Sequence, residues 1–192
     1  MFAALKRKAQ APVQSTDLTE GLQRALRNPA REEGVAGDGP REPIRQALSA
    51  LDAALARLEE AGSLVRQAAR PVIEAASETD PGQRALLAER FDDVRQKIDT
   101  LLTEEDEPAR PLLLAGAGRL TVQLAGASYI ISPFPLSTAE SGLDLPPPAE
   151  AFATHTEIAD TLRRVETALE RVARAMEVYS EDEAFLRTRL GG

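Results

Sequence analysis

The apolar residues of the chain first fall into a helical pattern at Ile44. From there, apolar or small residues recur at alternating steps of four and three, which is the a and d spacing of a heptad. The positions of this first series are Ile44, Leu48, Leu51, Leu55, Leu58, Gly62, Val65, Ala69, Val72 and Ala76. The series predicts a long amphipathic helix, approached closely by a partner helix at its small residues, Gly62 and Ala69. Pro71 lies inside the series, and we expect a kink or an interruption there.

A second, shorter helix is predicted after residue 79. Asp80 suits the N-cap, Pro81 suits the first helical position, and Gln83 is placed to close a capping box. Its apolar residues again step by four and three: Leu87, Phe91, Val94, Ile98 and Leu101. We expect it to end near Thr103, because an acidic run and a proline follow. Phe91 is the only aromatic residue of this series, and we expect it to be buried against both long helices.

A third helix is predicted over residues 154–190. Thr154 and Glu157 have the spacing of a capping box at its start. Apolar residues follow the same four-and-three spacing, which returns near the end of the helix. They are Ile158, Leu162, Val165, Leu169, Val172, Met176 and Tyr179, and then Leu186 and Leu190. At ~1.5 Å per residue, such a helix is roughly 55 Å long, which suits a bundle or a filament better than a globule.

Between the second and third helices the apolar period falls to two. Leu120, Val122 and Leu124 alternate with polar residues, and Tyr129 opens another short apolar run after a Gly-containing break. This pattern predicts a β-hairpin near residues 118–132, packed on the helices. Residues 132–151 then form a long, proline-rich connection.

The first 43 residues lack an apolar period and are rich in Gly and Pro towards their end. They carry a net charge of +1, whereas the remaining residues carry −9. One short helix is conceivable after Thr16, where Leu18, Leu22 and Leu26 recur at every fourth position, but it is too short to be stable alone. We therefore predict a flexible charged tail or linker over residues 1–43. Residues 44–190 are predicted to form a mainly α domain, an elongated three-helix bundle with a small β-hairpin.

Composition excludes several kinds of site. With 23 Lys and Arg against 31 Asp and Glu, the net charge is −8, which disfavours non-specific binding of nucleic acid. The absence of Cys excludes disulfides and thiolate-ligated metals, and a single histidine, His155, excludes a multi-histidine site. No apolar run reaches the ~18–20 residues of a membrane span, and the first residues do not have the order of a secretory signal.

The remaining polar motifs have ordinary structural interpretations. His155 lies beside the Thr154 cap, where we expect it to be exposed. Residues 104–107 are acidic but lack the alternating oxygen ligands and the glycine of a calcium loop, so we expect a solvated acidic loop. Gly116 and Gly118 precede a strand and lack the third glycine of a dinucleotide loop, so we expect a turn. The sequence therefore indicates no catalytic, cofactor-binding or metal-binding residue, and we expect a protein that is not an enzyme.

Several short sequence motifs, taken in their order along the chain, resemble the helical outer-core domain of bacterial flagellins. Residues 51–69, LDAALARLEEAGSLVRQAA, are similar to the flagellin helix that follows the inner-core segment. The second flagellin helix is matched at Asp80, Arg84, Leu87, Phe91, Val94, Gln96, Ile98, Asp99 and Leu101. Residues 112–116 stand where flagellins have N-L-L-x-G, and residues 158–189 are similar to the returning helix. Ser137, Thr138, Gly142, Leu143 and Leu145 resemble the end of the hairpin region in alphaproteobacterial-type flagellins.

The resemblance implies a fold, a role and a location. It implies a bundle of long helices with a hairpin and a non-enzymatic structural or interaction role at the flagellar filament or in its assembly. Its partners would be flagellin subunits or other flagellar proteins, with self-association possible, and it would be exported to the flagellum or medium without a cleaved signal peptide. The chain departs from flagellins where they have apolar terminal segments that build the inner tube, and residues 107–111 replace their Asn-Gly turn. We therefore expect a protein that decorates, caps or regulates the filament.

A second interpretation remains open. Heptad helices recur in unrelated bundle families, so the resemblance can reflect shared bundle physics alone. On this interpretation the chain is a cytoplasmic helical adaptor or an export-chaperone-like protein, and its acidic surface binds a basic partner.

Overall fold

The computed structural model describes residues 41–124 and 126–191, all within the unit Pro40–Gly192. It is mainly helical, with one small antiparallel sheet, as predicted. The elements are α2 (Arg41–Ser77), α3 (Pro81–Asp99), the 3-10 helix η1 (Glu104–Asp106), α4 (Arg110–Leu113), β1 (Leu120–Leu124), β2 (Ala127–Ile131) and α5 (His155–Gly191). The helix considered after Thr16, and the tail as far as residue 40, lie outside the described residues.

Helix α2 begins at Arg41, three residues before the predicted start, and continues through Pro71 to Ser77. Pro43 is accommodated in the first turn, where backbone N–H groups have no partner within the helix. The expected interruption at Pro71 is wrong, because α2 is one continuous helix. A proline inside a helix removes one hydrogen bond, and here the Pro71 ring is buried in the core.

The buried stripe of α2 is rotated relative to the predicted one. One half of the predicted series is buried as expected: Ile44, Leu51, Leu58, Val65 and Val72. In the other half only Gly62 is buried; Leu48, Leu55 and Ala69 are half-buried, and Ala76 is exposed. The stripe is completed by alanines seven residues apart: Ala47, Ala54, Ala61, Ala68 and Ala75. Because α2 packs against both α3 and α5, its buried face is centred between two partners rather than on one.

The two other helices start at their predicted caps. The Asp80 carboxylate accepts a hydrogen bond from the Gly82 N–H at 2.9 Å, and α3 ends at Asp99, four residues before the predicted end. At α5, the Thr154 hydroxyl accepts from the Glu157 N–H at 3.2 Å. The Glu157 carboxylate accepts from the Glu150 N–H at 2.8 Å, so it holds the preceding loop instead of closing the predicted box.

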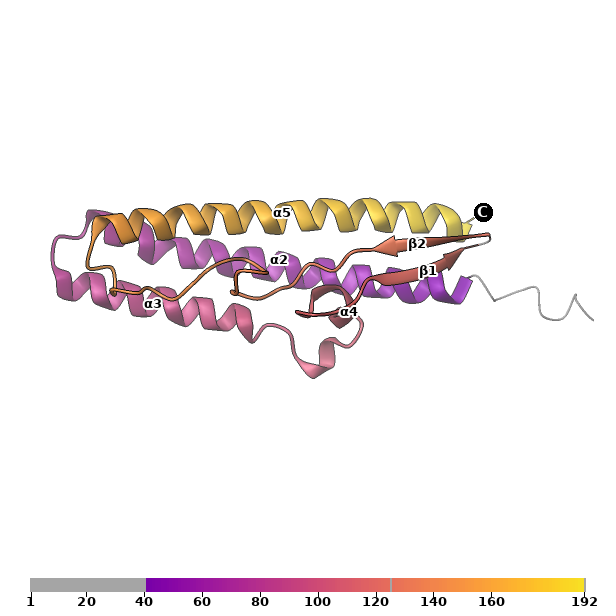
Figure 1. Cartoon of the computed structure of the whole chain (residues 1–192), viewed down its shortest axis with the longest axis horizontal. Coiled ribbons are helices and arrows are strands. Elements are labelled where there is room, and N and C mark those ends of the chain that lie inside the picture. The colour runs from indigo at the N-terminus through magenta and orange to yellow at the C-terminus, as the bar shows by residue number, and fades with distance from the viewer. Residues whose placement is uncertain (1–40, 125, 192) are drawn as a thin grey trace, which may run out of the picture. The chain divides into compact units, whose positions relative to one another are not determined.

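Helices α2 and α5 run antiparallel along each other (Figure 1). Asp52 near the start of α2 lies 3.4 Å from Arg187 near the end of α5. The hairpin lies at this end of the bundle, with β1 against α2 and Tyr129 of β2 stacked on Phe185 of α5 at 4.5 Å. Its register pairs Leu120 with Ile131. The predicted hairpin near residues 118–132 is confirmed.

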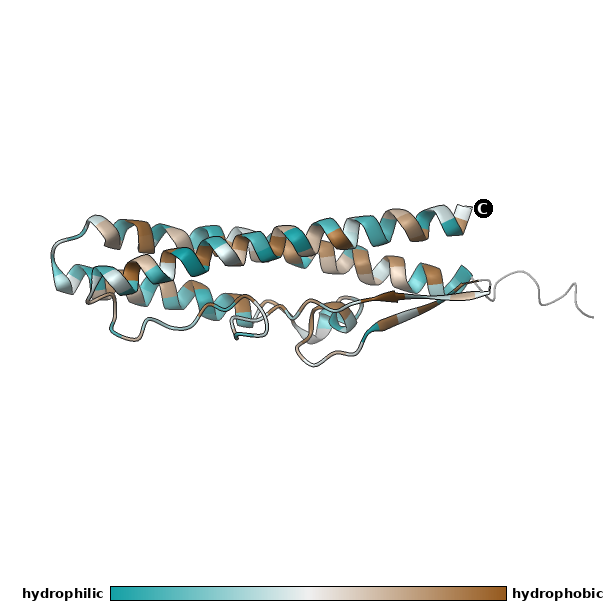
Figure 2. Ribbon diagram, turned by 45° about the horizontal axis from the view of Figure 1, so that its top comes forward, coloured by the Kyte–Doolittle hydropathy of each residue, from teal (hydrophilic) through white to brown (hydrophobic). Residues whose placement is uncertain are grey.

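Residues 132–153, which we call the strap, connect β2 to α5 and run between α3 and α5 (Figure 1). The sequence gives no helical or strand period there, yet four of its apolar side chains are buried: Leu136, Leu143, Leu145 and Phe152. Figure 2 shows that hydrophobic positions recur along α2, α3 and α5. Phe152, which has no place in any periodic pattern of the sequence, has no exposed side-chain area.

Candidate functional site

The densest polar network of the described residues fixes the strap to α3. The Thr138 N–H and hydroxyl donate to the two carboxylate oxygens of Asp99, each at 2.7 Å. Arg95 Nη1 donates to the same hydroxyl at 2.8 Å, and Arg95 Nε pairs with Asp92 at 2.6 Å. Thr138 itself is buried. A charge-assisted network of this kind is stronger than neutral hydrogen bonds and holds the strap in one register on α3.

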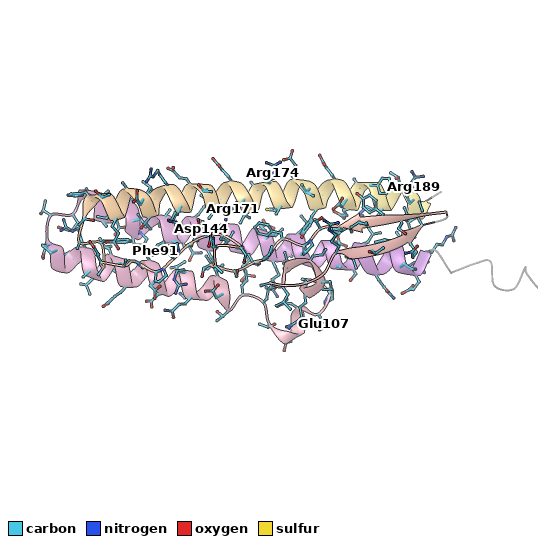
Figure 3. The ribbon with its side chains drawn as sticks, viewed as in Figure 1. Phe91, Glu107, Asp144, Arg171, Arg174 and Arg189 are labelled. Carbon is cyan, nitrogen blue, oxygen red and sulfur yellow. The ribbon has the colours of Figure 1, made fainter. Side chains whose placement is uncertain are left out.

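Helix α5 holds the other side of the strap through two arginines. Arg171 donates to the Gly142 carbonyl at 2.6 Å, and Arg164 pairs with Asp144 at 2.8 Å. Figure 3 shows Asp144 and Arg171 together between the strap and α5. Gly142 is required there by space, because a Cβ would lie 2.4 Å from the Ser137 carbonyl oxygen. The strap thus bridges two helices through backbone groups of Thr138 and Gly142 and through the side chains of Thr138 and Asp144.

Two open hollows, of about 700 Å³ and about 300 Å³, flank the Asp144–Arg164 pair. Arg95 lines the larger hollow and Arg163 the smaller one. Each of these arginines, like Arg164, has a carboxylate partner in the chain: Asp92 for Arg95, Asp160 for Arg163 and Asp144 for Arg164. The arginines that line these hollows are therefore all paired with carboxylates of the same chain.

Tyr179 of α5 anchors the start of the strap from inside the core. Its hydroxyl accepts from the Phe134 N–H at 2.9 Å and lies 2.9 Å from the Leu112 carbonyl, to which it donates. Burial raises the pKa of Tyr179 to about 12. The sequence places Tyr179 on the apolar stripe, and this is correct. Its role as a polar anchor was missed, although a tyrosine among aliphatic core positions signals a hydroxyl that needs a partner.

A second tyrosine fastens the hairpin to the end of α5. Tyr129 donates to Asp182 at 2.5 Å, and burial, reinforced by this hydrogen bond, raises the pKa of Tyr129 to about 12. The guanidinium of Arg189 lies 5.1 Å from the centre of the Phe185 ring, on which Tyr129 stacks. These contacts hold β2 against the last turns of α5.

The acidic run at residues 104–107 is only partly the solvated loop that the sequence indicates. Asp106 is 8% exposed, and it accepts from the Thr103 N–H at 2.8 Å and from Arg57 Nε of α2 at 2.7 Å. The hydrogen bond from Thr103, followed by the one from Arg57, holds the pKa of Asp106 below its ordinary value. Glu105 and Glu107 are exposed, and Figure 3 shows Glu107 at the tip of this turn. Asp106 is thus a structural link between η1 and α2.

The other motifs lie where the sequence places them. His155 is the exposed first residue of α5, and Gly116 adopts a φ of 79° in a turn before β1. Within residues 41–124 and 126–191, no three His, Asp or Glu side chains are grouped so that they could hold a metal ion. No helix in this part of the chain combines the length and apolarity needed to cross a membrane. Neither the known protein families nor the curated proteins contain a match to this sequence.

Proposed function

We propose that this chain is a non-enzymatic flagellin-like structural or interaction protein that acts at the bacterial flagellar filament or in its assembly. The observation that carries the proposal is the order and pairing of the elements. A long helix, a shorter helix, a hairpin, a long connection and a long returning helix follow one another, as the resemblance to the flagellin outer core implies. The first turns of α2 and the last turns of α5 lie at one end of the bundle, with the hairpin beside them.

The polar contacts of the site support a role that depends on shape. Thr138 and Gly142 of the strap are tied to two different helices, and Asp106 ties η1 to a third. These contacts use the site's charged side chains to fix backbone positions. A subunit that packs against others needs a surface whose shape is fixed before binding, because ordering it on contact costs affinity.

The partners in this proposal are flagellin subunits or other flagellar proteins, met at the flagellum or outside the cell after export without a cleaved signal peptide. The protein would pack against these partners through exposed positions of its helices and its hairpin. Single exposed apolar residues occur on several elements: Ile73, Leu86, Leu114, Ile130 and Val178. A second copy of the chain is a further partner in the same manner.

Sedimentation with preformed flagellin filaments tests this proposal. We expect the folded protein to pellet with filaments in a saturable manner and to remain in the supernatant without them. Circular dichroism of the same sample establishes that the helices are intact. A folded protein that stays in the supernatant at every filament concentration, and leaves filament assembly unchanged, would contradict the proposal.

A second candidate function rests on the acidic surface around η1. Arg57 pairs with both Glu60 and Asp106, and Glu105 and Glu107, the neighbours of Asp106 in the chain, are exposed. An acidic surface of this kind suits a cytoplasmic helical adaptor or an export-chaperone-like protein with a basic partner. Cell fractionation distinguishes the two: export into the medium or the flagellum favours the first function, and retention in the cytosol favours the second.

A further inference from the structure

The strap concentrates the unusual backbone geometry of the molecule. In the described part of the chain, the non-glycine residues with positive φ are Asp144 at 56°, Ala151 at 49° and Phe152 at 58°, all within the strap. This conformation brings Cβ too close to the following carbonyl oxygen and is disfavoured for residues other than glycine. It persists only where surrounding contacts hold it. The strap is therefore held in place against a local backbone preference.

The contacts that hold the strap differ from those that hold the helices. Two amides near its start donate to the end of α4: Phe134 N–H to the Leu112 carbonyl at 2.7 Å and Leu136 N–H to the Leu113 carbonyl at 2.8 Å. Beyond them it is held to the bundle by side chains such as Asp99 and Arg171. Five prolines stiffen it: Pro133, Pro135, Pro146, Pro147 and Pro148. The strap is also held by its four buried apolar side chains, but it has no continuous ladder of hydrogen bonds of the kind that holds a helix, so its contacts can be lost as a group while the helices stay formed.

The helices do not depend on the strap for their mutual packing. Helix α2 packs directly against α3 and against α5 through its own buried stripe. The strap covers the remaining side of this core, where Phe152 lies on Phe91 with ring centres 5.9 Å apart. Its removal would uncover Phe91 while α2 kept both of its helical partners.

We infer that the strap opens as one unit, from about residue 134 to residue 152, while α2, α3 and α5 remain packed. The open form presents an apolar groove beside α3 that the closed form covers, so the strap acts as a built-in lid on this surface. The strain at Ala151 favours opening, and the hydrogen bonds of Thr138 oppose it. This inference does not depend on the proposed function.

Hydrogen exchange of the intact protein tests the inference at the strap amides of Phe134, Leu136 and Thr138, which donate to the Leu112 and Leu113 carbonyls of α4 and to the Asp99 carboxylate of α3. We expect them to exchange at a common rate that is faster than that of the core amides of α2 and α5. Ala151→Gly removes the positive-φ strain at an exposed position. It should slow exchange of the three strap amides by about fivefold, and the slowest helix amides by the same factor, because the closed form is the starting state for both strap opening and global unfolding.

Two comparisons complete the experiment. Thr138→Val removes the hydroxyl that bonds to Asp99 and Arg95, and should accelerate the strap amides. Ala56→Gly makes the same kind of substitution at an exposed position of α2, and should accelerate the slowest helix amides while the strap amides stay unchanged, because α2 is intact in the open form. Strap amides that exchange as slowly as the slowest α2 amides, or that Ala56→Gly accelerates as much as those amides, would overturn the inference. Either result would mean that the strap opens only when the whole domain unfolds.

Discussion

Phe91 of α3 and Phe152 of the strap meet with their ring centres 5.9 Å apart and their planes tilted by 52°. Neither side chain is exposed. A tilted pair at this distance has a favourable edge-to-face component in addition to the burial of both rings. The strap therefore contributes directly to the packing of α3, and residues 61 positions apart share one hydrophobic contact.

The first prediction concerns this aromatic pair. Phe91→Ala and Phe152→Ala should each lower the free energy of unfolding by ~3–5 kcal/mol, because each leaves a large cavity in a closed core. The double variant should lose less than the sum of the two, since both substitutions remove the same contact. Urea unfolding followed by circular dichroism measures this. Ile73→Ala, at a position that is 56% exposed, is the control and should change stability by less than ~0.5 kcal/mol. If Phe152→Ala behaved like this control, the buried position of the strap would be wrong.

The second prediction contrasts two glycines. A Cβ at Gly62 would lie 3.5 Å from a Val172 methyl, which is ordinary contact, whereas one at Gly142 would lie 2.4 Å from the Ser137 carbonyl oxygen. Gly62→Ala should therefore stabilise the domain by about 0.5–1 kcal/mol through helix propensity. Gly142→Ala should destabilise it, because backbone atoms must move. Thermal unfolding checks whether each variant is more or less stable than wild type. Destabilisation by Gly62→Ala would show that α2 and α5 pack more tightly than described.

The third prediction is a dependence on acid. The pKa of Asp106 is lowered in the folded state, so the carboxylate contributes stability above its ordinary pKa of about 3.9, and this contribution is lost as pH falls through the lower folded value. Asp106→Asn should reduce the stability at neutral pH and weaken the loss of stability between roughly pH 5 and pH 2. Glu105→Gln, at an exposed neighbour, should leave this loss unchanged. Equal acid profiles for wild type and Asp106→Asn would contradict the role given to the Arg57–Asp106 pair.

The fourth prediction concerns alkaline pH. Because burial raises the pKa of Tyr179 to about 12, the unfolded chain loses this proton first, and stability falls as pH rises above about 10. Tyr179→Phe should reduce this alkaline loss, while the similarly raised pKa of Tyr129 leaves part of it in place. At neutral pH the variant should lose about 0.5–1.5 kcal/mol, because the hydrogen bonds to Phe134 and Leu112 are gone. An unchanged alkaline profile would argue against a buried hydroxyl.

The helices and the hairpin were predictable because their signals are periodic and local. Heptad spacing marks α2, α3 and α5, alternation marks the hairpin, and Asp80 and Thr154 mark two helix starts. The rotation of α2 was not predictable, because Ala54 and Leu55 suit a buried position equally well by type. Which of them is covered depends on where α3 and α5 lie. The continuity of α2 through Pro71 likewise depends on tertiary packing rather than on local preference.

The strap and its contacts were the least predictable part. Leu143 and Phe152 lie in a proline-rich segment without any period, so nothing in the local pattern distinguishes them from exposed residues. Asp99 and Thr138 are 39 positions apart, and their pairing exists only once the strap is folded back onto α3. The sequence correctly places His155 on the surface, but it cannot separate Asp106, which is buried, from its exposed acidic neighbours.

The most direct test of the proposed role is the growth of flagellin filaments from monomers at increasing concentrations of this protein, with filament mass and bound protein measured together. A flagellin-like partner should enter the pellet in proportion to filament mass or filament ends, and it should change the rate or the extent of growth. Filaments that grow at an unchanged rate, with this protein folded and entirely in the supernatant, would contradict a role at the filament.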